Sequence, residues 1–242
     1  MWCLSLVTDF IRNTVARRIC GDIVWSDSPG DAMRKWRDIY RVSQAEVSRI
    51  MNIAPSVISD YEKGRRIPGA RFVRRFVEAL LKVDSERGWS ITLQMAKTMN
   101  LHLEAIVDVC EFVSPIDVRK FSDIVDGIIL TSSTFNRKIY GYTVLDSLKA
   151  IETLSGAEFF QIMGLTSERA LVFTKVTIGR SPMVAVRVSL IKPAAVVVHG
   201  PKTVDKLAIK LAEKERLPLI LSRIPSEEEL VEALKRICES LT

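Results

Sequence analysis

The sequence predicts a multidomain chain in which an all-α N-terminal domain precedes an α/β C-terminal domain. The length of 242 residues exceeds the roughly 100 to 200 residues of one domain, which suggests two. Apolar residues recur at steps of three and four through the first part, as in amphipathic helices. From about residue 126 short apolar segments alternate with helical segments, which is typical of a largely parallel sheet covered by helices.

The composition is that of an ordinary folded protein without a membrane segment. Hydrophobic residues make up 48% and charged residues 26% of the chain, as in most globular domains. No run reaches the roughly 18 apolar residues of a membrane helix. The N-terminal WCLSLV lacks the basic region and the cleavage site of a signal peptide. We therefore expect a cytoplasmic protein with no membrane partner.

The cysteines offer no metal site, because Cys3, Cys20, Cys110 and Cys238 lie far apart and form no CxxC pair. We expect no metal and no other cofactor, and small core side chains at these positions. The chain has only four Asn and three Gln residues, which hints at a thermophilic source. In such a cell a disulfide remains an alternative.

The basic excess belongs to the N-terminal part. Residues 1–88 carry 16 Lys and Arg against 11 Asp and Glu, a balance of +5, and residues 89–242 carry 19 against 18, a balance of +1. One basic block contains no acidic residue and would attract phosphate, although a solvated protein face has the same composition. The block consists of Lys63, Arg65, Arg66, Arg71, Arg74 and Arg75.

Residues 1–30 are expected to form an amphipathic helix and a connector. Apolar residues stand at helical steps over residues 4–19. A stretch with Pro and Gly follows, and Asp31 is the expected N-cap of a helix over residues 32–41. That helix would open a central domain over residues 31–85.

Two short helices joined by a tight turn come next. Ser43 and Glu46 have the spacing of a capping box, so a helix begins there. Asn52 tolerates the left-handed backbone of a sharp turn. Pro55 suits the first turn of a second helix, which Gly64 would end. Two such helices, with a polar face on the second and basic residues after it, describe a helix-turn-helix, whose second helix enters the major groove of DNA.

The run from Met33 to about Leu81 resembles the lambda-repressor-like, or XRE-type, DNA-binding domain. The consensus sequence of that family contains Ser-Gln, an apolar residue three positions after the Gln, Ile-Ser and Glu-x-Gly-x-x-x-Pro. It is present here as Ser43, Gln44, Val47, Ile58, Ser59, Glu62, Gly64 and Pro68. The sequence departs from the common pattern at Ser48, Asn52 and Ala54, and these changes are conservative in shape.

The resemblance implies double-stranded DNA as a partner. Gln44 and Lys63 would contact phosphates, which fix the register on the duplex. The outer face of the second helix would meet base edges, where Asp60 can only accept, most readily from the cytosine amino group. The arginines after it would add affinity through phosphates or a minor groove. The expected DNA-binding residues are Gln44, Pro55, Ser56, Ser59, Asp60, Lys63, Arg65, Arg66 and Arg71.

Few of these residues are expected to contact bases, so one domain would bind DNA with modest affinity. We therefore expect a homodimer, because binding two half-sites about 34 Å apart multiplies that affinity. The helix that begins at Arg71 carries aromatic residues that we expect in the core. Residues 86–125 are expected to form one or two helices, broken at Ser114-Pro115, that connect the domains or dimerise.

Residues 126–242 form the predicted α/β domain. Strands are expected at GIILTSS, EFFQIMG and PLILS and twice within SPMVAVRVSLIKPAAVVVHG. Helices are expected at TVLDSLKAIETL, SERALVFTKV, TVDKLAIKLAEKE and EEELVEALKRICES. Ligands of such sheets bind at the carboxyl ends of strands, and HGPKT leads into a helix whose first amides, with Lys202, suit an anion. The expected ligand-binding residues are Thr131, Ser132, Ser133, His199, Gly200, Lys202 and Ser222.

Residues 194–237 loosely resemble DRTGG-type regulatory domains, without a diagnostic motif. GRSPM, residues 179–183, is either a polar loop near the same site or a turn. His199 has no nucleophile or carboxylate at an informative spacing, so we expect no catalytic residue and no enzyme.

The whole arrangement resembles archaeal regulators with an N-terminal helix-turn-helix and a C-terminal α/β domain. Our leading hypothesis is a homodimeric, sequence-specific transcriptional regulator whose C-terminal domain senses a small-molecule effector or mediates assembly. Two alternatives stay open. One is a transcription cofactor whose helix-turn-helix binds a protein, as in the multiprotein bridging factors. The other is an enzyme acting on a phosphorylated metabolite, with an autoregulatory DNA-binding domain.

Overall fold

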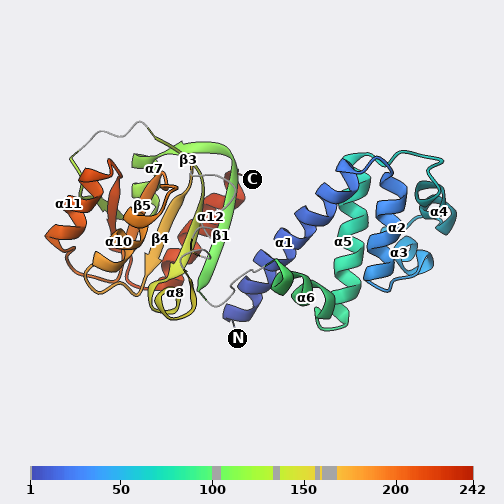
Figure 1. The fold of residues 1–242 in the computed structure, drawn as a ribbon, viewed down its shortest axis with the longest axis horizontal. Coiled ribbons are helices and arrows are strands. Elements are labelled where there is room, and N and C mark those ends of the chain that lie inside the picture. Colours follow the sequence, from blue (N-terminus) through green and yellow to red (C-terminus); the bar gives the residue numbers. More distant parts are fainter. Residues whose placement is uncertain (1, 100–104, 133–136, 156–158, 160–167, 242) are drawn as a thin grey trace. The chain divides into compact units, whose positions relative to one another are not determined.

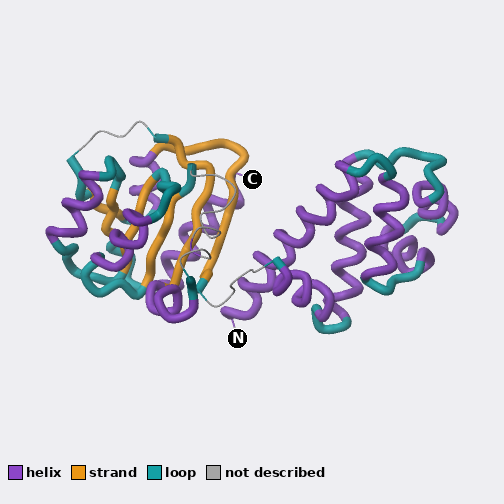
Figure 2. The backbone as a smooth tube through the Cα atoms, viewed as in Figure 1, coloured by secondary structure: helices purple, strands orange, loops and turns teal. Residues whose placement is uncertain are grey.

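The computed structural model describes residues 2–99, 105–132, 137–155, 159 and 168–241. The chain divides into a helical unit, Thr8–Leu101, and a second compact unit that contains His102–Thr242. Figure 2 shows helices and loops in the first unit, and a sheet with helices in the second. The predicted fold class, an all-α helix-turn-helix domain followed by an α/β domain, is confirmed.

The helices of the first part of the chain follow one another through short loops (Figure 1). They are α1 (Trp2–Trp25), α2 (Pro29–Ile39), α3 (Gln44–Met51), α4 (Pro55–Glu62), α5 (Ala70–Glu86) and α6 (Ser90–Thr98).

Helix α1 confirms the predicted N-terminal helix and is longer than expected. Ile11, Val15 and Ile19 are buried on one stripe, and Ile23 continues that stripe by one more turn. Residues 20–25, expected as part of a connector, are therefore helical, because the apolar stripe still has a core to pack against. The chain leaves the helix only after this last buried residue.

The start of α2 differs from the prediction, because Ser28 and not Asp31 is the N-cap. Pro29 occupies the first helical position, where its missing N–H costs no hydrogen bond. Asp31 lies within the first turn, where the positive end of the helix dipole stabilises a carboxylate. In α5 the expected core side chains, such as Phe76 and Leu80, are buried.

The second unit has a six-stranded sheet of order β1-β3-β4-β5-β6-β2. The strands β3 to β6 are parallel, and the two edge strands β1 and β2 run antiparallel to their neighbours. The strands are β1 (Ile106–Asp117), β2 (Gly127–Ile129), β3 (Lys138–Asp146), β4 (Ala170–Thr174), β5 (Ala195–His199) and β6 (Leu219–Ser222). The predicted largely parallel sheet is confirmed.

Helices pack on both faces of this sheet. Figure 1 shows α10 and α11 in front of the parallel strands and α12 behind them. One core cluster joins the sheet to α7 and α12 through Phe121, Leu230 and Leu234. The helices are α7 (Val118–Ile124), α8 (Ser147–Thr153), α10 (Arg180–Val188), α11 (Lys206–Lys214) and α12 (Glu227–Leu241).

The expectation of helices throughout residues 86–125 is wrong. Helices α6 and α7 lie there, but residues 106–117 between them form the edge strand β1, which pairs with β3. Ser114-Pro115 does not end an element, because it lies in an irregular part of this strand between Glu111 and Ile116. A proline is tolerated at a bulge of an edge strand, where its missing N–H breaks no ladder bond.

Three segments of the α/β unit also differ from the prediction. Residues 170–174, expected as helix, form the fully buried strand β4. Residues 180–188, expected as strand, form α10, because parallel neighbours such as β4 and β5 need a long crossover, usually a helix. Residues 143–146 belong to β3, and the helix starts only at Ser147 because Asp146 caps it. The expected strand EFFQIMG lies outside the described residues except for Phe159.

A disulfide joins Cys110 of β1 to Cys238 of α12, with 6.2 Å between their Cα atoms. The expectation of small unpaired core cysteines is therefore wrong for these two residues, and the disulfide alternative holds. Cys20 in α1 is free. Among the described helices none is long and apolar enough to cross a membrane.

Candidate nucleic-acid interface

Helix α3 begins with the predicted capping box. The Ser43 hydroxyl accepts a hydrogen bond from the Glu46 amide at 3.2 Å, and a Glu46 carboxylate oxygen accepts from the Ser43 amide at 2.8 Å. The hydrogen bond from the Ser43 backbone lowers the pKa of the Glu46 carboxyl. The two reciprocal hydrogen bonds thus depend only on Ser43 and Glu46, three residues apart in the sequence, which explains why the start of this helix could be predicted.

The turn between α3 and α4 has the predicted geometry. Asn52 has φ 53° and ψ 52°, the left-handed conformation that Asn tolerates better than most residues. The Ile53 amide donates to the Ser48 carbonyl, which closes the end of α3. The guanidinium of Arg75 also donates to the carbonyl of Met51. Helix α4 then starts with Pro55 at its first position.

Apolar contacts fix the inner face of α4. Ile58 is fully buried, and the ring of Tyr61 lies 4.0 Å from the ring of Phe72 at the start of α5, centroid to centroid. On the outer face of α4, Pro55 and Ser56 are exposed. This face is therefore available to a partner.

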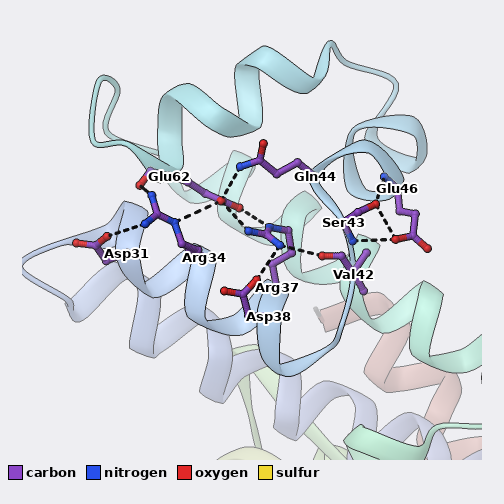
Figure 3. A network of polar contacts seen from close by, with 9 residues as sticks. All are labelled: Asp31, Arg34, Arg37, Asp38, Val42, Ser43, Gln44, Glu46 and Glu62. Atoms are coloured by element: carbon purple, nitrogen blue, oxygen red, sulfur yellow. Dashed lines mark hydrogen bonds and ion pairs between the residues drawn. The ribbon is translucent and has the colours of Figure 1, made fainter.

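A buried carboxylate holds three helices together at the end of α4 (Figure 3). The side chain of Glu62 is completely buried, and its two oxygens accept from Nε and Nη2 of Arg37 at 2.7 and 3.0 Å. Gln44 donates to the same carboxylate at 2.8 Å. Arg34 donates to the carbonyl oxygen of Glu62 at 2.9 Å. This network joins α2, α3 and α4, and neither Arg34 nor Arg37 belongs to the predicted site.

A sequence signal for this network existed but was weak. Arg37 stands four residues after the buried Met33, on the apolar side of α2, where a charge needs a partner. Glu62 belongs to the consensus sequence of the family, but that consensus does not indicate which residues Glu62 contacts. Gln44 is half-buried, and its amide nitrogen faces Glu62. Its expected contact with a phosphate stays a prediction.

The polar residues expected to face DNA share the outer side of α4. Pro55 and Ser56 are exposed, and Ser59 and Asp60 are half-buried. Asp60 is not a free acceptor, because its Oδ1 lies 3.2 Å from Arg65 and its Oδ2 lies 3.9 Å from Arg66. The carboxylate thus anchors two of the arginines that were expected to add affinity.

Two further cations of the basic block, Lys63 and Arg71, flank the loop between α4 and α5. Lys63 follows α4 directly, and Arg71 lies in the first turn of α5; both are exposed. Ile67, in the loop between them, is 85% exposed. Such a loop offers a positive surface beside the outer face of α4, which suits a polyanion.

The expected ligand-binding residues of the α/β unit do not lie at the same end of the parallel strands. His199 ends β5 and pairs in register with Ser222 at the end of β6. Thr131 lies instead beside Leu219, at the start of β6, because β2 runs antiparallel to β6. Grouping the loop after β2 with the carboxyl ends of the parallel strands is therefore wrong. Ser133 lies outside the described residues.

The side chains at the carboxyl edge already have structural roles. Nε2 of His199 lies 2.8 Å from the Ile224 carbonyl oxygen, to which it donates. The Ser222 hydroxyl donates to the Val125 carbonyl at 2.7 Å. Gly200 has φ 116° and lies against the backbone of Val176, which leaves no room for a Cβ. Ser132, at the opposite edge, bonds the Glu213 carboxylate.

HGPKT does not lead directly into a helix, contrary to the prediction. Helix α11 starts at Lys206, and Asp205 caps it by accepting from the Leu207 amide at 2.8 Å. Lys202 is exposed in the preceding loop. The first amides of α11 are thus taken by a side chain of the same chain and are not offered to an anion.

GRSPM forms the start of α10 and borders a small pocket. Residues of α8, of the loop after β4 and of the first turn of α10 line this pocket, among them Ser147, Lys175 and Arg180. Lys175 pairs with Asp146 at 2.6 Å. Burial raises the pKa of Asp146, but the hydrogen bonds from Lys175 and from the first amides of α8 outweigh burial and lower it overall. No cluster of three metal-ligating side chains occurs among the described residues.

Comparisons with known proteins point to the same region. A family model described as "Helix-turn-helix" matches residues 33–84. An uncharacterised HTH-type transcriptional regulator of Archaeoglobus fulgidus is 47% identical over 225 residues, which cover 92% of this chain and 97% of that protein. One of Methanocaldococcus jannaschii is 42% identical over 228 residues, covering 92% and 94%. No solved structure matches the chain.

Proposed function

Because the chain belongs to the HTH-type transcriptional regulators, and is thus a DNA-binding protein, we propose that it recognises one operator sequence as a homodimer. The membership confirms the resemblance to XRE-type regulators. The observation that carries the proposal is the free polar face of α4, which the Glu62 network fixes against α2 and α3.

Base recognition is assigned to Pro55, Ser56, Ser59 and Asp60. Hydroxyl groups contact any base, so the sharpest preference comes from Asp60, whose carboxylate accepts from the cytosine amino group. The first turn of α4 is the part of a recognition helix that reaches base edges. Pro55 and Ser56 lie in this turn and are exposed, which supports the assignment.

Phosphate contacts are assigned to the basic residues around α4. Lys63, Arg65, Arg66 and Arg71 are exposed in the structure, and each cation placed on a phosphate releases about one counterion, so that binding weakens steeply with salt. Gln44 adds a neutral contact at the start of α3. These contacts fix the position of the protein and carry no sequence information.

The homodimer follows from the small number of base contacts. Two helix-turn-helix domains that bind half-sites about 34 Å apart have a far higher affinity for a pseudo-palindromic operator than one domain has for a half-site. The α/β unit is assigned either to the sensing of a small molecule or to assembly. The pocket beside Lys175 and Arg180 is its candidate binding region. A ligand that prefers the DNA-competent state would shift its population.

The testing experiment is selection of random duplex DNA by the purified protein, followed by binding of the enriched site over a series of salt concentrations. We expect a symmetric motif and a steep salt slope. Arg71→Ala should weaken binding to all sequences and reduce the slope by about one. Arg119→Ala, an exposed substitution on α7, is the matched control and should change neither.

Failure to enrich any sequence would contradict the proposal. A protein partner bound with no salt dependence would then favour the cofactor alternative. Turnover of a phosphorylated metabolite that is lost in His199→Ala would favour the enzyme alternative.

A further inference from the structure

One apolar side chain lies in the middle of the basic loop between α4 and α5. Residues 63–71 read KGRRIPGAR and contain four cations and no acidic residue. Ile67, at the centre of this loop, is 85% exposed. A single exposed aliphatic residue ordinarily needs no explanation. Ile67 differs because its loop directly follows the helix that is assigned to base recognition, so DNA bound to that helix lies beside Ile67.

The loop is held in place at both of its ends. The Arg65 amide donates to the Asp60 carbonyl oxygen at 2.9 Å, and the Asp60 carboxylate lies 3.2 Å from the Arg65 guanidinium. At the other end the Val73 amide donates to the Gly69 carbonyl oxygen at 3.0 Å and so begins α5. Ile67 lies between these two anchors on a short stretch of chain. Contact with DNA therefore orders little additional backbone, which keeps the entropic cost of the contact low.

The geometry of α4 directs this loop toward the minor groove. Ser56, in the first turn of α4, is assigned to base edges in the major groove. Glu62 ends the helix six residues later, which is about 9 Å along the axis. The major groove is about 12 Å wide, so a helix that starts among the base edges ends at the phosphate strand that borders the groove. Ile67 follows five positions after Glu62 and lies beyond that strand, on the side of the adjacent minor groove.

An aliphatic side chain distinguishes base pairs in the minor groove by what it excludes. Both kinds of pair present acceptors there, and a G·C pair adds the amino group of guanine. This amino group protrudes into the groove and needs an acceptor or water. Ile67 displaces water and has no side-chain acceptor, so a G·C pair beside it keeps an unsatisfied donor, whereas an A·T pair does not. Isoleucine is among the apolar residues that minor-groove proteins insert into DNA.

The cations around Ile67 favour DNA over an apolar protein surface as its partner. The side chains of Arg65 and Arg66 are 66% and 58% exposed, and Lys63 and Arg71 are exposed as well. The cores of protein interfaces are depleted of charge, because a protein partner has to strip water from each charged group. The phosphates on the two sides of a minor groove neutralise such cations instead. The loop thus combines cations for the phosphates with one apolar side chain for the groove between them.

We propose that Ile67 is a specificity-determining residue, which contacts the minor groove next to the major-groove site of α4 and selects A·T over G·C pairs there. The inference rests on the proposed function, because it needs the operator that α4 recognises. It adds a second source of sequence preference to the few base contacts of α4. It does not depend on the homodimer, since every half-site meets one such loop.

The test repeats the selection of random duplex DNA with the full-length wild type, with Ile67→Ala and with Leu93→Ala. The wild type should enrich A·T pairs at a position beside the contacts of α4, and Ile67→Ala should lose this preference and keep the others. Leu93 lies on α6 and is 38% exposed. Helix α6 follows the far end of the 17-residue α5 (Figure 1), about 25 Å from the loop. Leu93→Ala is therefore the matched control and should enrich the wild-type motif.

A second measurement assigns the preference to the minor groove. Inosine has the major-groove edge of guanine but lacks its minor-groove amino group. The selected site is compared with two versions that carry G·C or I·C at the position that Ile67→Ala identifies. The wild type should bind the A·T and I·C versions equally tightly and the G·C version about tenfold more weakly, as for one unfavourable base pair. Ile67→Ala should bind all three versions with equal affinity.

The outcomes separate this inference from the proposed function. An Ile67→Ala protein with native circular dichroism that enriches the wild-type motif overturns the inference and leaves the proposed function intact. A wild type that binds the I·C version as weakly as the G·C version does the same, because the preference then comes from the major groove. A wild type that enriches no motif at all contradicts the proposed function, and the inference fails with it.

Discussion

Arg37 and Glu62 form a two-pronged ion pair in which the Glu62 side chain is completely buried and the Arg37 side chain is 13% exposed. The pair joins α2 to the last turn of α4 across 25 residues of sequence. The hydrogen bonds with Glu62 raise the pKa of Arg37 further above its ordinary value. The orientation of α4 therefore depends on a polar contact as well as on Ile58 and Tyr61.

Arg37→Ala should lower the free energy of unfolding by about 3 kcal/mol, because it leaves the Glu62 carboxylate buried with weaker partners. The loss stays near the lower end of such values since Gln44 and Arg34 still reach Glu62. Urea unfolding followed by circular dichroism measures it. Arg74→Ala removes a guanidinium from the exposed pair with Glu78 and should cost less than about 0.5 kcal/mol. Equal losses in the two variants would contradict the prediction.

Asp60→Ala should raise the affinity for unrelated duplex DNA several-fold and reduce the preference for the selected site. The substitution removes a negative charge from the DNA-facing side and frees Arg65 and Arg66 from their carboxylate partner. The lost contact to cytosine is worth about 1–3 kcal/mol of discrimination. Competition between the selected site and a scrambled site measures both effects.

Glu78→Ala is the control for Asp60→Ala, because it removes an acid from the exposed side of α5. It should leave the preference for the selected site unchanged. An Asp60→Ala protein that discriminates between the two duplexes as well as the wild type would remove Asp60 from base recognition.

The helix-turn-helix could be predicted because its signals are local. The capping box uses two residues of one turn, Asn52 accepts the left-handed turn by itself, and Pro55 needs no partner at its position. The Arg37–Glu62 pair escaped prediction for the opposite reason. The position of Arg37 on the apolar side of α2 indicates that it needs a partner, but the sequence does not identify Glu62, 25 residues away, as that partner.

The errors in the second unit come from segments whose apolar pattern fits either element. Strand β4 is a short buried run, and such runs read equally as helix. Helix α10 has valines on both its buried and its exposed sides, which imitates a strand. The candidate ligand site was wrong because β2 runs antiparallel to β6, which puts the loop after β2 at the other end of the sheet. The residues of β2 do not indicate this direction.

Asp146→Asn should destabilise the protein at neutral pH and have a smaller effect in acid. Because the net pKa of Asp146 is lowered in the folded protein, its carboxylate contributes stability above its ordinary value, near 4. That contribution is lost as the pH falls through the lowered pKa. Unfolding free energies of both proteins at pH 7 and at pH 3 measure the effect. A difference between the two proteins that grows in acid would contradict the assignment.

Cys238→Ser should lower the stability of the α/β unit under oxidising conditions. The disulfide joins β1 to α12 over a sequence separation of 128 residues. A cross-link of this span is worth up to about 5 kcal/mol by the loss of chain entropy in the unfolded state. A reducing agent should lower the melting temperature of the wild type to that of Cys238→Ser and leave the variant unchanged. Cys20→Ser, at a free cysteine, should keep the response to the reducing agent. A wild type with no such response would show that the cross-link carries no stability.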